Sequence, residues 1–175
     1  MPKKVVILGP ESTGKSTLSK LLAEKFNAPW VTDYARKYLL EHGMDYSFDH
    51  LLIIAKGQLK SEDEILSKTI APVVFIDTDM HVMKVWCEFV FGKTHEFILK
   101  ELATRKYDLF LLCNIDLPWV KDELREYPDL ETRQKLYKIY RDMLVNENLP
   151  WVDVHGDHEQ RFKIAEQAVQ KLLQD

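Results

Sequence analysis

Continuous apolar runs alternate along the chain with segments of helical periodicity. The runs are VVILG (5–9), PVVFIDTD (72–79), YDLFLLC (107–113) and PWVDV (150–154). Each is short, rich in β-branched or aromatic residues and followed by glycine or polar residues, a pattern that predicts a buried strand. A further short strand is expected at Trp30 and Val31, just before the polar segment TDYAR.

The segments between these runs predict helices. Residues 15–27 carry apolar side chains at helical spacing, at Leu18, Leu21, Leu22 and Phe26. A second helix is expected to end before Gly43, and Ser47 is suited to cap a long helix that runs to Leu66. Further helices are predicted at 79–91, at 95–105, after residue 133 and at about 157–173.

Strands that alternate with helices predict an α/β fold with a parallel sheet and helices on both faces. In such folds, ligands bind beyond the carboxyl ends of the strands. The polar segments GPESTGKS, TDYAR, DTD and CNIDLPW each begin where a predicted strand stops. We therefore expect their side chains along one rim of the sheet.

Length, composition and charge indicate one globular domain. The chain has 175 residues, of which 46% are hydrophobic and 30% charged, and its net charge is −4. This length suits one domain, placed at residues 1–175. Lys and Arg are interleaved with Asp and Glu, which argues against nucleic-acid binding. The apolar runs are too short to span a bilayer or to form a signal peptide, so we expect a cytoplasmic protein without membrane contact.

The segment GPESTGKST (9–17) fits the pattern G-x-x-x-x-G-K-[ST] between a predicted strand and a predicted helix. Gly9 and Gly14 let the backbone wrap tightly and turn its N–H groups inward, toward phosphate oxygens. Lys15 can reach the β- and γ-phosphates, and the Ser16 hydroxyl can ligate Mg²⁺. The predicted ATP-binding residues are Gly9, Glu11, Ser12, Thr13, Gly14, Lys15, Ser16 and Thr17.

Two further segments carry acids at this rim. Asp77 ends a predicted strand and is the candidate for holding the Mg²⁺ shell. Asp79 either contacts substrate hydroxyls or caps the following helix. Asp33 is the candidate that accepts the acceptor's hydroxyl proton, and Arg36 is suited to bind anionic oxygens. The alternative for these two residues is a helix cap and a surface ion pair.

The segment 114–133 is polar, contains two prolines and carries cations at Lys121, Arg125 and Arg133. Between a strand and a long helix, this composition is typical of a mobile lid that closes over nucleotide. An ordinary solvated connection would have similar charges, so both interpretations stay open. In the lid interpretation, Arg125 closes on the transferring group.

As a set, these motifs and the late Arg161 resemble the ribosylnicotinamide kinase domains of NadR-type NAD-biosynthesis proteins, from about Val5 to Leu173. The resemblance implies a three-layer P-loop NTPase fold of the nucleoside-kinase type with a small helical lid. It also implies ATP and Mg²⁺ as cofactors and a ribosyl 5′-hydroxyl as acceptor. Matched by position, it assigns phosphate and metal contacts to Lys15 and Ser16, a lid arginine to Arg125, and contacts around the acceptor to Asp33, Arg36, Asp77 and Asp79.

The chain departs from the family pattern in two ways. It shows no H-x-G-H-type motif of the adenylyltransferase domain that precedes the kinase in NadR-type proteins, so that activity is not expected. The aromatic pair that holds the nicotinamide ring in the family aligns with Thr32 and Lys60, neither of which offers an aromatic face. We therefore expect weaker use of nicotinamide riboside than in a family member with both aromatics, and improvement in Thr32→Trp.

The sequence as a whole predicts an Mg-ATP-dependent kinase that phosphorylates a small molecule, with nicotinamide riboside or a similar nucleoside as acceptor. One alternative is a kinase for another nucleoside or a phosphorylated metabolite. Another is a nucleotide-dependent switch or sensor that hydrolyses ATP slowly and acts through a partner. A strong rise in ATP consumption on adding a nucleoside would distinguish a kinase from a switch.

Overall fold

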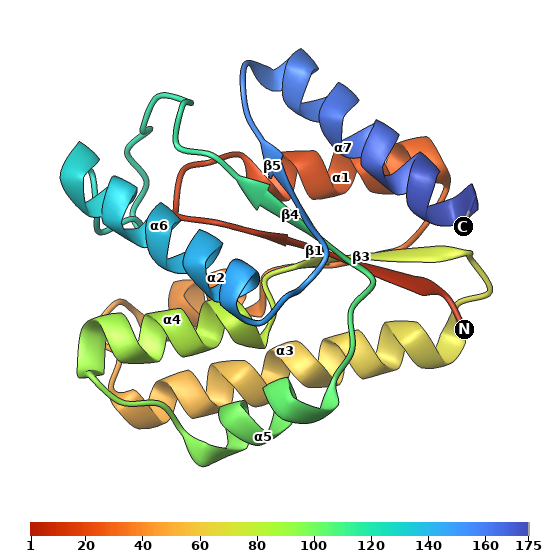
Figure 1. Cartoon of the computed structure of the whole chain (residues 1–175). Coiled ribbons are helices and arrows are strands. Elements are labelled where there is room, and N and C mark those ends of the chain that lie inside the picture. The colour runs from red at the N-terminus through yellow and green to blue at the C-terminus, as the bar shows by residue number, and fades with distance from the viewer. Residues whose placement is uncertain (175) are drawn as a thin grey trace.

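The structure is a computed structural model that describes residues 1–174, and in these residues strands and helices largely alternate (Figure 1). The strands are β1 (Lys3–Leu8), β2 (Trp30–Val31), β3 (Val73–Asp77), β4 (Leu109–Cys113) and β5 (Trp151–Val154). The helices are α1 (Lys15–Phe26), α2 (Tyr34–His42), α3 (Phe48–Lys68), α4 (Met80–Phe91), α5 (Glu96–Thr104), α6 (Leu130–Asn146) and α7 (His158–Gln174). Every predicted element is present, with small shifts at the ends.

The strands form one sheet in the order β2-β3-β1-β4-β5, and each neighbouring pair is parallel. Every residue of β3 and β4 is buried, as are the last four residues of β1. Strands covered on both faces have no solvent-facing side, which explains the uninterrupted apolar runs in the sequence. The order changes direction at β1, so the loop after this strand lies where α/β folds bind ligands.

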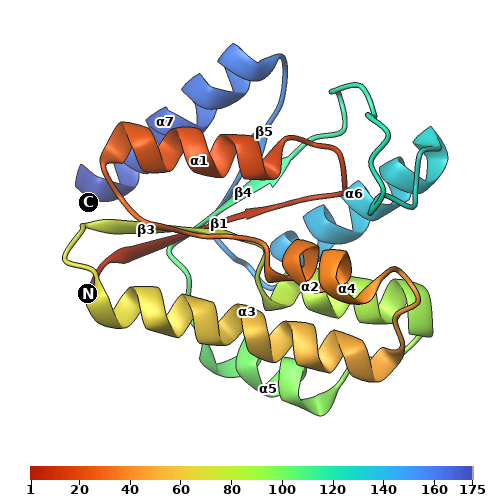
Figure 2. The same cartoon turned by 180° about the vertical axis from the view of Figure 1, so that it is seen from behind.

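Helices cover both faces of the sheet, which confirms the predicted three-layer α/β fold (Figures 1 and 2). Val5 and Ile7 of β1 pack in a cluster with α1 and α7. Val6 and Leu8 point to the opposite face, because side chains alternate along a strand, and pack in a cluster with α4 and α6. A third cluster joins α2, α3, α4 and α5 below the sheet in Figure 1.

The connection between β4 and α6 differs from the small helical lid that the resemblance implies. Residues 114–129 contain neither helix nor strand, and the predicted lid is helical only at 130–133, which form the first turn of α6. Pro118 and Pro128 explain the difference, since proline lacks a backbone N–H and disfavours helical backbone in the preceding residue. The helical lid implied by the resemblance is therefore a loop here, and we call residues 114–129 the lid loop.

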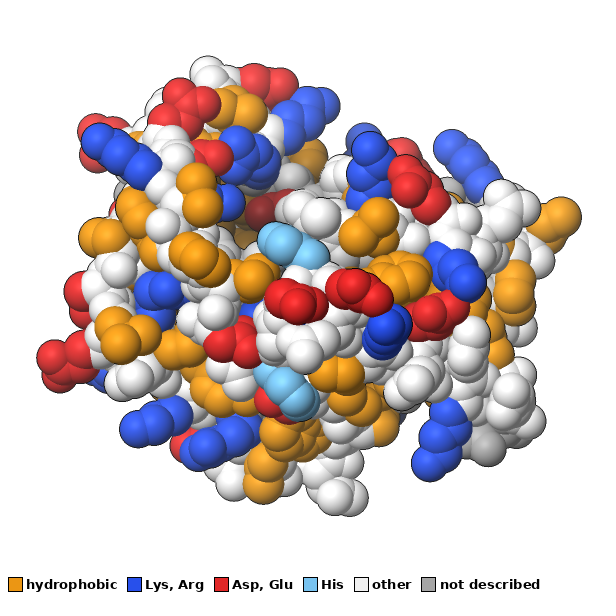
Figure 3. Space-filling model, turned by 90° about the horizontal axis from the view of Figure 1, so that it is seen from above, with side chains coloured by type: hydrophobic (Ala, Val, Ile, Leu, Met, Phe, Trp, Pro, Cys, Tyr) orange, Lys and Arg blue, Asp and Glu red, His pale blue; other side chains and the backbone are white. Residues whose placement is uncertain are grey.

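Charges are mixed on the surface. Lys and Arg side chains are interleaved with Asp and Glu across the face seen in Figure 3. Within residues 1–174, none of the helices combines the length and the apolar character needed to cross a membrane. The expectations of a cytoplasmic location and of no nucleic-acid partner stay predictions.

Candidate active site

The loop between β1 and α1 has the backbone of a phosphate-binding loop. Gly9 has φ 138° and Gly14 has φ 78°, values that L side chains rarely adopt. A Cβ on Gly9 would lie 2.7 Å from the carbonyl oxygen of Cys113, so the close approach to β4 requires glycine. No side chain caps α1, whose N-cap is Gly14. The first N–H groups of this helix are therefore available to an anion.

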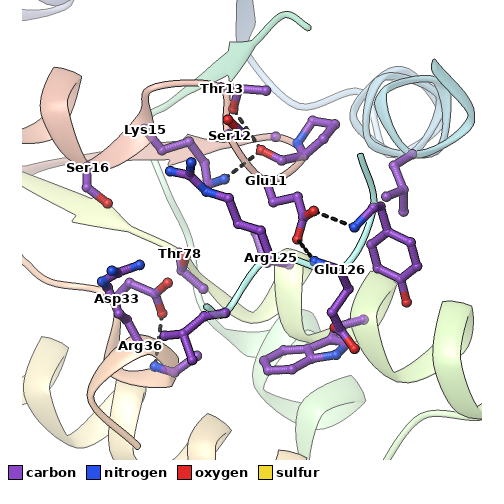
Figure 4. Close-up of a pocket in the computed structure, with 18 of the residues that line it drawn as sticks. Glu11, Ser12, Thr13, Lys15, Ser16, Asp33, Arg36, Thr78, Arg125 and Glu126 are labelled. Atoms are coloured by element: carbon purple, nitrogen blue, oxygen red, sulfur yellow. Dashed lines mark hydrogen bonds between the residues drawn. The ribbon is translucent and has the colours of Figure 1, made fainter. Parts of the chain in front are cut away.

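Lys15 lies over this loop. Its Nζ donates a hydrogen bond to the carbonyl oxygen of Pro10 at 2.7 Å, and the Thr13 hydroxyl donates to the same oxygen at 2.7 Å. Figure 4 shows Lys15 reaching across the loop and Arg125 extending toward it from the lid loop. Two cationic side chains thus converge where phosphates of a nucleotide would sit.

Ser16 and Asp77 form the predicted pair at the start of α1 and the end of β3. The Ser16 hydroxyl donates to Oδ2 of Asp77 at 2.5 Å. Asp77 is 1% exposed, and its Oδ1 is buried without a hydrogen-bond partner among the described residues. Burial raises the pKa of Asp77 to about 6, helped by the Asp33 carboxylate and opposed by the Lys15 ammonium. A buried carboxylate oxygen without a partner fits a cation ligand, so these residues suit the predicted Mg²⁺ role.

Asp33 is the helix cap considered as the alternative for it, and its role as proton acceptor stays a prediction. It is the N-cap of α2, because one carboxylate oxygen accepts a hydrogen bond from the N–H of Ala35 at 2.9 Å, and it also lines the cavity. Burial raises the pKa of Asp33, while Lys15 opposes the shift. Figure 4 shows the carboxylate of Asp33 on the cavity side of α2.

Arg36, in the first turn of α2, reaches the lid loop. Its guanidinium forms an ion pair with Asp122 at 2.9 Å, which lowers the pKa of the Asp122 carboxyl. The ion pair considered as the alternative is therefore present. Arg36 also lines the cavity, so it joins α2 to the lid loop at the cavity's edge.

Asp79 is a cap in this structure. It is buried, its carboxylate accepts from the backbone N–H groups of His81 and Val82, and its second oxygen lies 2.5 Å from Nδ1 of His81. Asp79 and Asp77 do not line the cavity, whereas Thr78 between them does. Of the two interpretations of Asp79, the structure therefore favours the helix cap over substrate contact.

The side chains of Glu11 and Ser12 bind the lid loop. The Glu11 carboxylate accepts hydrogen bonds from the backbone N–H groups of Glu126 and Tyr127, at 3.0 and 2.6 Å. It also accepts one from Nε1 of Trp119 at 3.2 Å, and the Ser12 hydroxyl accepts one from the N–H of Val120 at 2.9 Å. These contacts hold the lid loop over the phosphate-binding loop, as Figure 4 shows for Glu11.

Arg161 of α7 supports the loop from behind. It is 3% exposed and donates hydrogen bonds to the carbonyl oxygens of Thr13, Asn114 and Gly156, at 2.8 to 2.9 Å. It also pairs with Asp116. A buried guanidinium thus ties the loops after β1, β4 and β5 together.

The phosphate-binding loop, α2, α4, the lid loop and α6 enclose a cavity of about 280 Å³. The predicted residues that line it are Gly9, Glu11, Ser12, Thr13, Gly14, Lys15, Ser16, Thr17, Asp33, Arg36 and Arg125. Sequence reasoning missed the remainder of the wall, which includes Thr78, Trp86, Phe89, Glu126, Tyr127 and Tyr140. Helical spacing in 79–91 predicted α4 but did not separate its cavity-facing aromatics from its core residues.

The aromatic faces of the cavity come from other positions than the aligned pair. Thr32 is exposed, the Lys60 side chain is 80% exposed beside Glu64, and neither lines the cavity. The expectation that these positions face the acceptor is wrong, because Thr32, directly after β2, and Lys60 of α3 are both exposed to solvent. Trp86 and Phe89 supply the aromatic wall instead.

Comparisons with known proteins show the family and the fold of the chain. A family model described as AAA domain matches residues 4–161. The chain belongs to this family. It is also 31% identical, over 98% of its length, to the Trifunctional NAD biosynthesis/regulator protein NadR of Escherichia coli (strain K12) and to that of Salmonella typhimurium (strain LT2). The chain spans 43% of the length of each of these two relatives.

Solved structures show the same fold. A crystal structure of NadR protein in complex with NR matches 99% of the chain and 52% of its own, with a TM-score of 0.83 and 23% identity. One of NadR protein in complex with NAD and AMP-PNP matches 99% of the chain and 50% of its own, with a TM-score of 0.79 and 23% identity. The crystal structure of thymidylate kinase from Ehrlichia chaffeensis matches 95% of the chain and 98% of its own length, with a TM-score of 0.64 and 14% identity. The resemblance inferred from the motifs is confirmed: the chain is a homologue of part of NadR with a kinase-type P-loop fold.

Proposed function

We propose that the chain is an Mg-ATP-dependent kinase that phosphorylates the hydroxyl of a nucleoside, with nicotinamide riboside as acceptor and nicotinamide mononucleotide as product. The observation that carries this proposal is that Lys15, Asp33 and Arg125 line one cavity, beside the free N-terminus of α1. Homology to part of NadR, a NAD-biosynthesis protein, supports this choice of acceptor.

In the proposed reaction, the acceptor's hydroxyl oxygen forms a bond to the γ-phosphorus of ATP. The bond from that phosphorus to the bridging oxygen breaks, and ADP leaves with the electron pair. The hydroxyl proton passes to Asp33, whose second oxygen is available because Ala35 occupies the first. A base with a raised pKa holds this proton better at neutral pH, which suits Asp33 to the task.

The cationic groups stabilise charge on the transferring group. Lys15 and Arg125 approach from the phosphate-binding loop and the lid loop. Ser16 and Asp77 would hold Mg²⁺, which when bound neutralises charge on the β- and γ-phosphates. Phe89 and Trp86 lie on α4 and provide apolar faces for the ring of the acceptor.

The test is a screen for phosphorylated products. Wild type is incubated with Mg-ATP and a panel of nucleosides, and mass spectrometry detects products heavier by one phosphate. Lys15→Ala should abolish transfer with the fold intact, whereas the matched control Lys20→Ala, an exposed residue on the same helix, should retain it. ATP hydrolysis that no nucleoside accelerates would instead support the nucleotide-dependent switch.

A further inference from the structure

Where α4 and the lid loop form the wall of the cavity, the carboxylate-bearing residue Glu126 lies beside aromatic residues. Trp86 and Phe89 of α4 line this part, together with Glu126 and Tyr127 of the lid loop. Phe89 and Tyr127 meet edge to face, with ring centroids 5.3 Å apart. Figure 4 shows Arg125 and Glu126, although adjacent in sequence, directed to different parts of the site.

A directional chain of hydrogen bonds fixes the carboxylate of Glu126. Nε1 of Trp86 donates to the hydroxyl oxygen of Tyr46 at 3.0 Å, and this hydroxyl donates its single proton to Oε2 of Glu126 at 2.9 Å. The rings of Tyr46 and Trp86 also pack edge to face, with centroids 5.0 Å apart. Tyr46 therefore holds Glu126 as an acceptor and has no second proton to offer.

The backbone of Glu126 is fixed as well. Its N–H donates to the Glu11 carboxylate at 3.0 Å, which attaches this point of the lid loop to the phosphate-binding loop. The carboxylate of Glu126 is thus held from two sides, by Tyr46 through its side chain and by Glu11 through its backbone. A group held in this way is preorganised for a ligand.

The charge of Glu126 is not neutralised by the described residues around it. Arg125 points toward Lys15 and donates to the carbonyl oxygen of Val120, while Arg36 pairs with Asp122. Among the hydrogen bonds of residues 1–174, the side chain of Glu126 uses Oε2 alone. Burial raises the pKa of Glu126, the hydrogen bond from Tyr46 opposes the shift, and the Glu11 carboxylate adds to it. Glu126 lines the cavity but is open to solvent, and its Oε1, which accepts no hydrogen bond among the described residues, suits a ligand that donates an N–H.

We propose that Glu126 is a specificity-determining residue that selects acceptors whose ring carries an N–H donor, such as a carboxamide, and that Tyr46 is its positioning residue. This inference rests on the proposed kinase function and deepens it. A ring that carries a carboxylate instead would bring two like charges together and leave Glu126 without a donor.

The experiment compares two acceptors that differ only at this group, nicotinamide riboside and nicotinic acid riboside. Wild type should favour the carboxamide by about 10-fold in kcat/KM, a moderate factor because Glu126 is exposed and water compensates part of the loss of a donor with the mismatched acceptor. Glu126→Gln keeps the shape and can donate to a carboxylate, so the preference should fall by about tenfold. The change should appear in the KM for the acceptor, with the KM for ATP unchanged.

Two further variants separate specificity from structure. Tyr46→Phe should shift the preference in the same direction by a smaller factor, because the carboxylate loses its donor but keeps its charge. Glu123→Gln, an exposed carboxylate of the same loop that does not line the cavity, is the matched control and should leave the preference unchanged. Calorimetric dissociation constants for both ribosides give the same comparison without turnover.

The possible outcomes separate the two proposals. If Glu126→Gln transfers phosphate with the wild-type preference, the assignment of Glu126 is overturned and the kinase proposal stands. If wild type neither binds nor phosphorylates any nucleoside, the kinase proposal is overturned and the assignment of Glu126 falls with it. A preference that shifts with Glu126 and Tyr46, but not with Glu123, supports both.

Discussion

Asp77→Asn is expected to stabilise the ligand-free protein while it lowers phosphoryl transfer. Asp77 is 1% exposed, and one of its carboxylate oxygens has no partner among the described residues. Its pKa is raised from 3.8 to about 6, chiefly by burial. A shift of about 2 units corresponds to about 3 kcal/mol of unfolding free energy that the ionised group costs at neutral pH. An uncharged amide removes this cost and still accepts from Ser16, but its own N–H groups need partners, so we expect a gain of about 1 to 3 kcal/mol.

The sign of the pH dependence follows from the direction of the shift. The pKa of Asp77 is higher in the folded protein than in the unfolded chain, so the folded state binds the proton more tightly. The favourable contribution of the protonated carboxyl is complete below pH 3.8 and is lost as the pH rises through about 6. The difference between Asp77→Asn and wild type should therefore be small near pH 4 and full above about pH 7.

Urea denaturation, followed by tryptophan fluorescence across this pH range, measures the difference directly. Asp45→Asn, at an exposed carboxylate that makes no hydrogen bond among residues 1–174, is the matched control and should show no such trend. Added Mg²⁺ should stabilise wild type above pH 7 but not the variant, because a ligand that binds only the folded state raises its stability. A gain of equal size at every pH, or a loss of stability at neutral pH, would refute the reasoning.

Four other predictions concern residues whose roles the structure separates. Asp33→Asn should lower kcat by about 10²- to 10⁴-fold with ATP affinity retained. Asp79→Asn keeps a cap acceptor for α4 but loses the carboxylate oxygen 2.5 Å from Nδ1 of His81, so it should instead lower stability by about 1 to 2 kcal/mol. Steady-state kinetics and urea denaturation check both, and a larger kcat loss in Asp79→Asn would exchange the two roles. Thr32→Trp should leave the KM for the acceptor unchanged, since Thr32 is exposed outside the cavity; a lower KM would place the new ring in the site. Gly9→Ala should abolish nucleotide binding measured by calorimetry, because its Cβ would meet a backbone oxygen of Cys113 at 2.7 Å; tight binding would mean that the loop can relax.

The parts of the structure that could be predicted from sequence are those with a local cause. Val73 to Ile76 are buried on both faces of the sheet, so the chain shows an uninterrupted apolar run there. The phosphate-binding loop depends on backbone conformations that only Gly9 and Gly14 allow at little cost, so its pattern is readable in the sequence. The cap of α2 by Asp33 is local as well.

The parts that could not be predicted depend on contacts between distant segments. The contact from Tyr127 to Glu11 joins residues 116 positions apart, and a glutamate within a phosphate-binding motif carries no signal that it binds a lid. Trp86 and Phe89 share the helical spacing of core residues, so their exposure to a cavity becomes visible only when α2 and the lid loop are in place. The prediction that Thr32 and Lys60 face the acceptor failed because α4 supplies the aromatic wall.

The buried contact of Arg161 with the Thr13 carbonyl has a consequence for synthesis, because it forms only after nearly the whole chain has been made. It joins residues 148 positions apart, so the phosphate-binding loop leaves the ribosome long before the side chain that braces it. At about 5 to 20 residues per second, this interval lasts roughly 7 to 30 s. Throughout that time the nascent chain displays its nucleotide motif without the Arg161 contact to the Thr13 carbonyl. ATP can therefore act as a folding ligand only for the completed domain, after α7 has docked against α1.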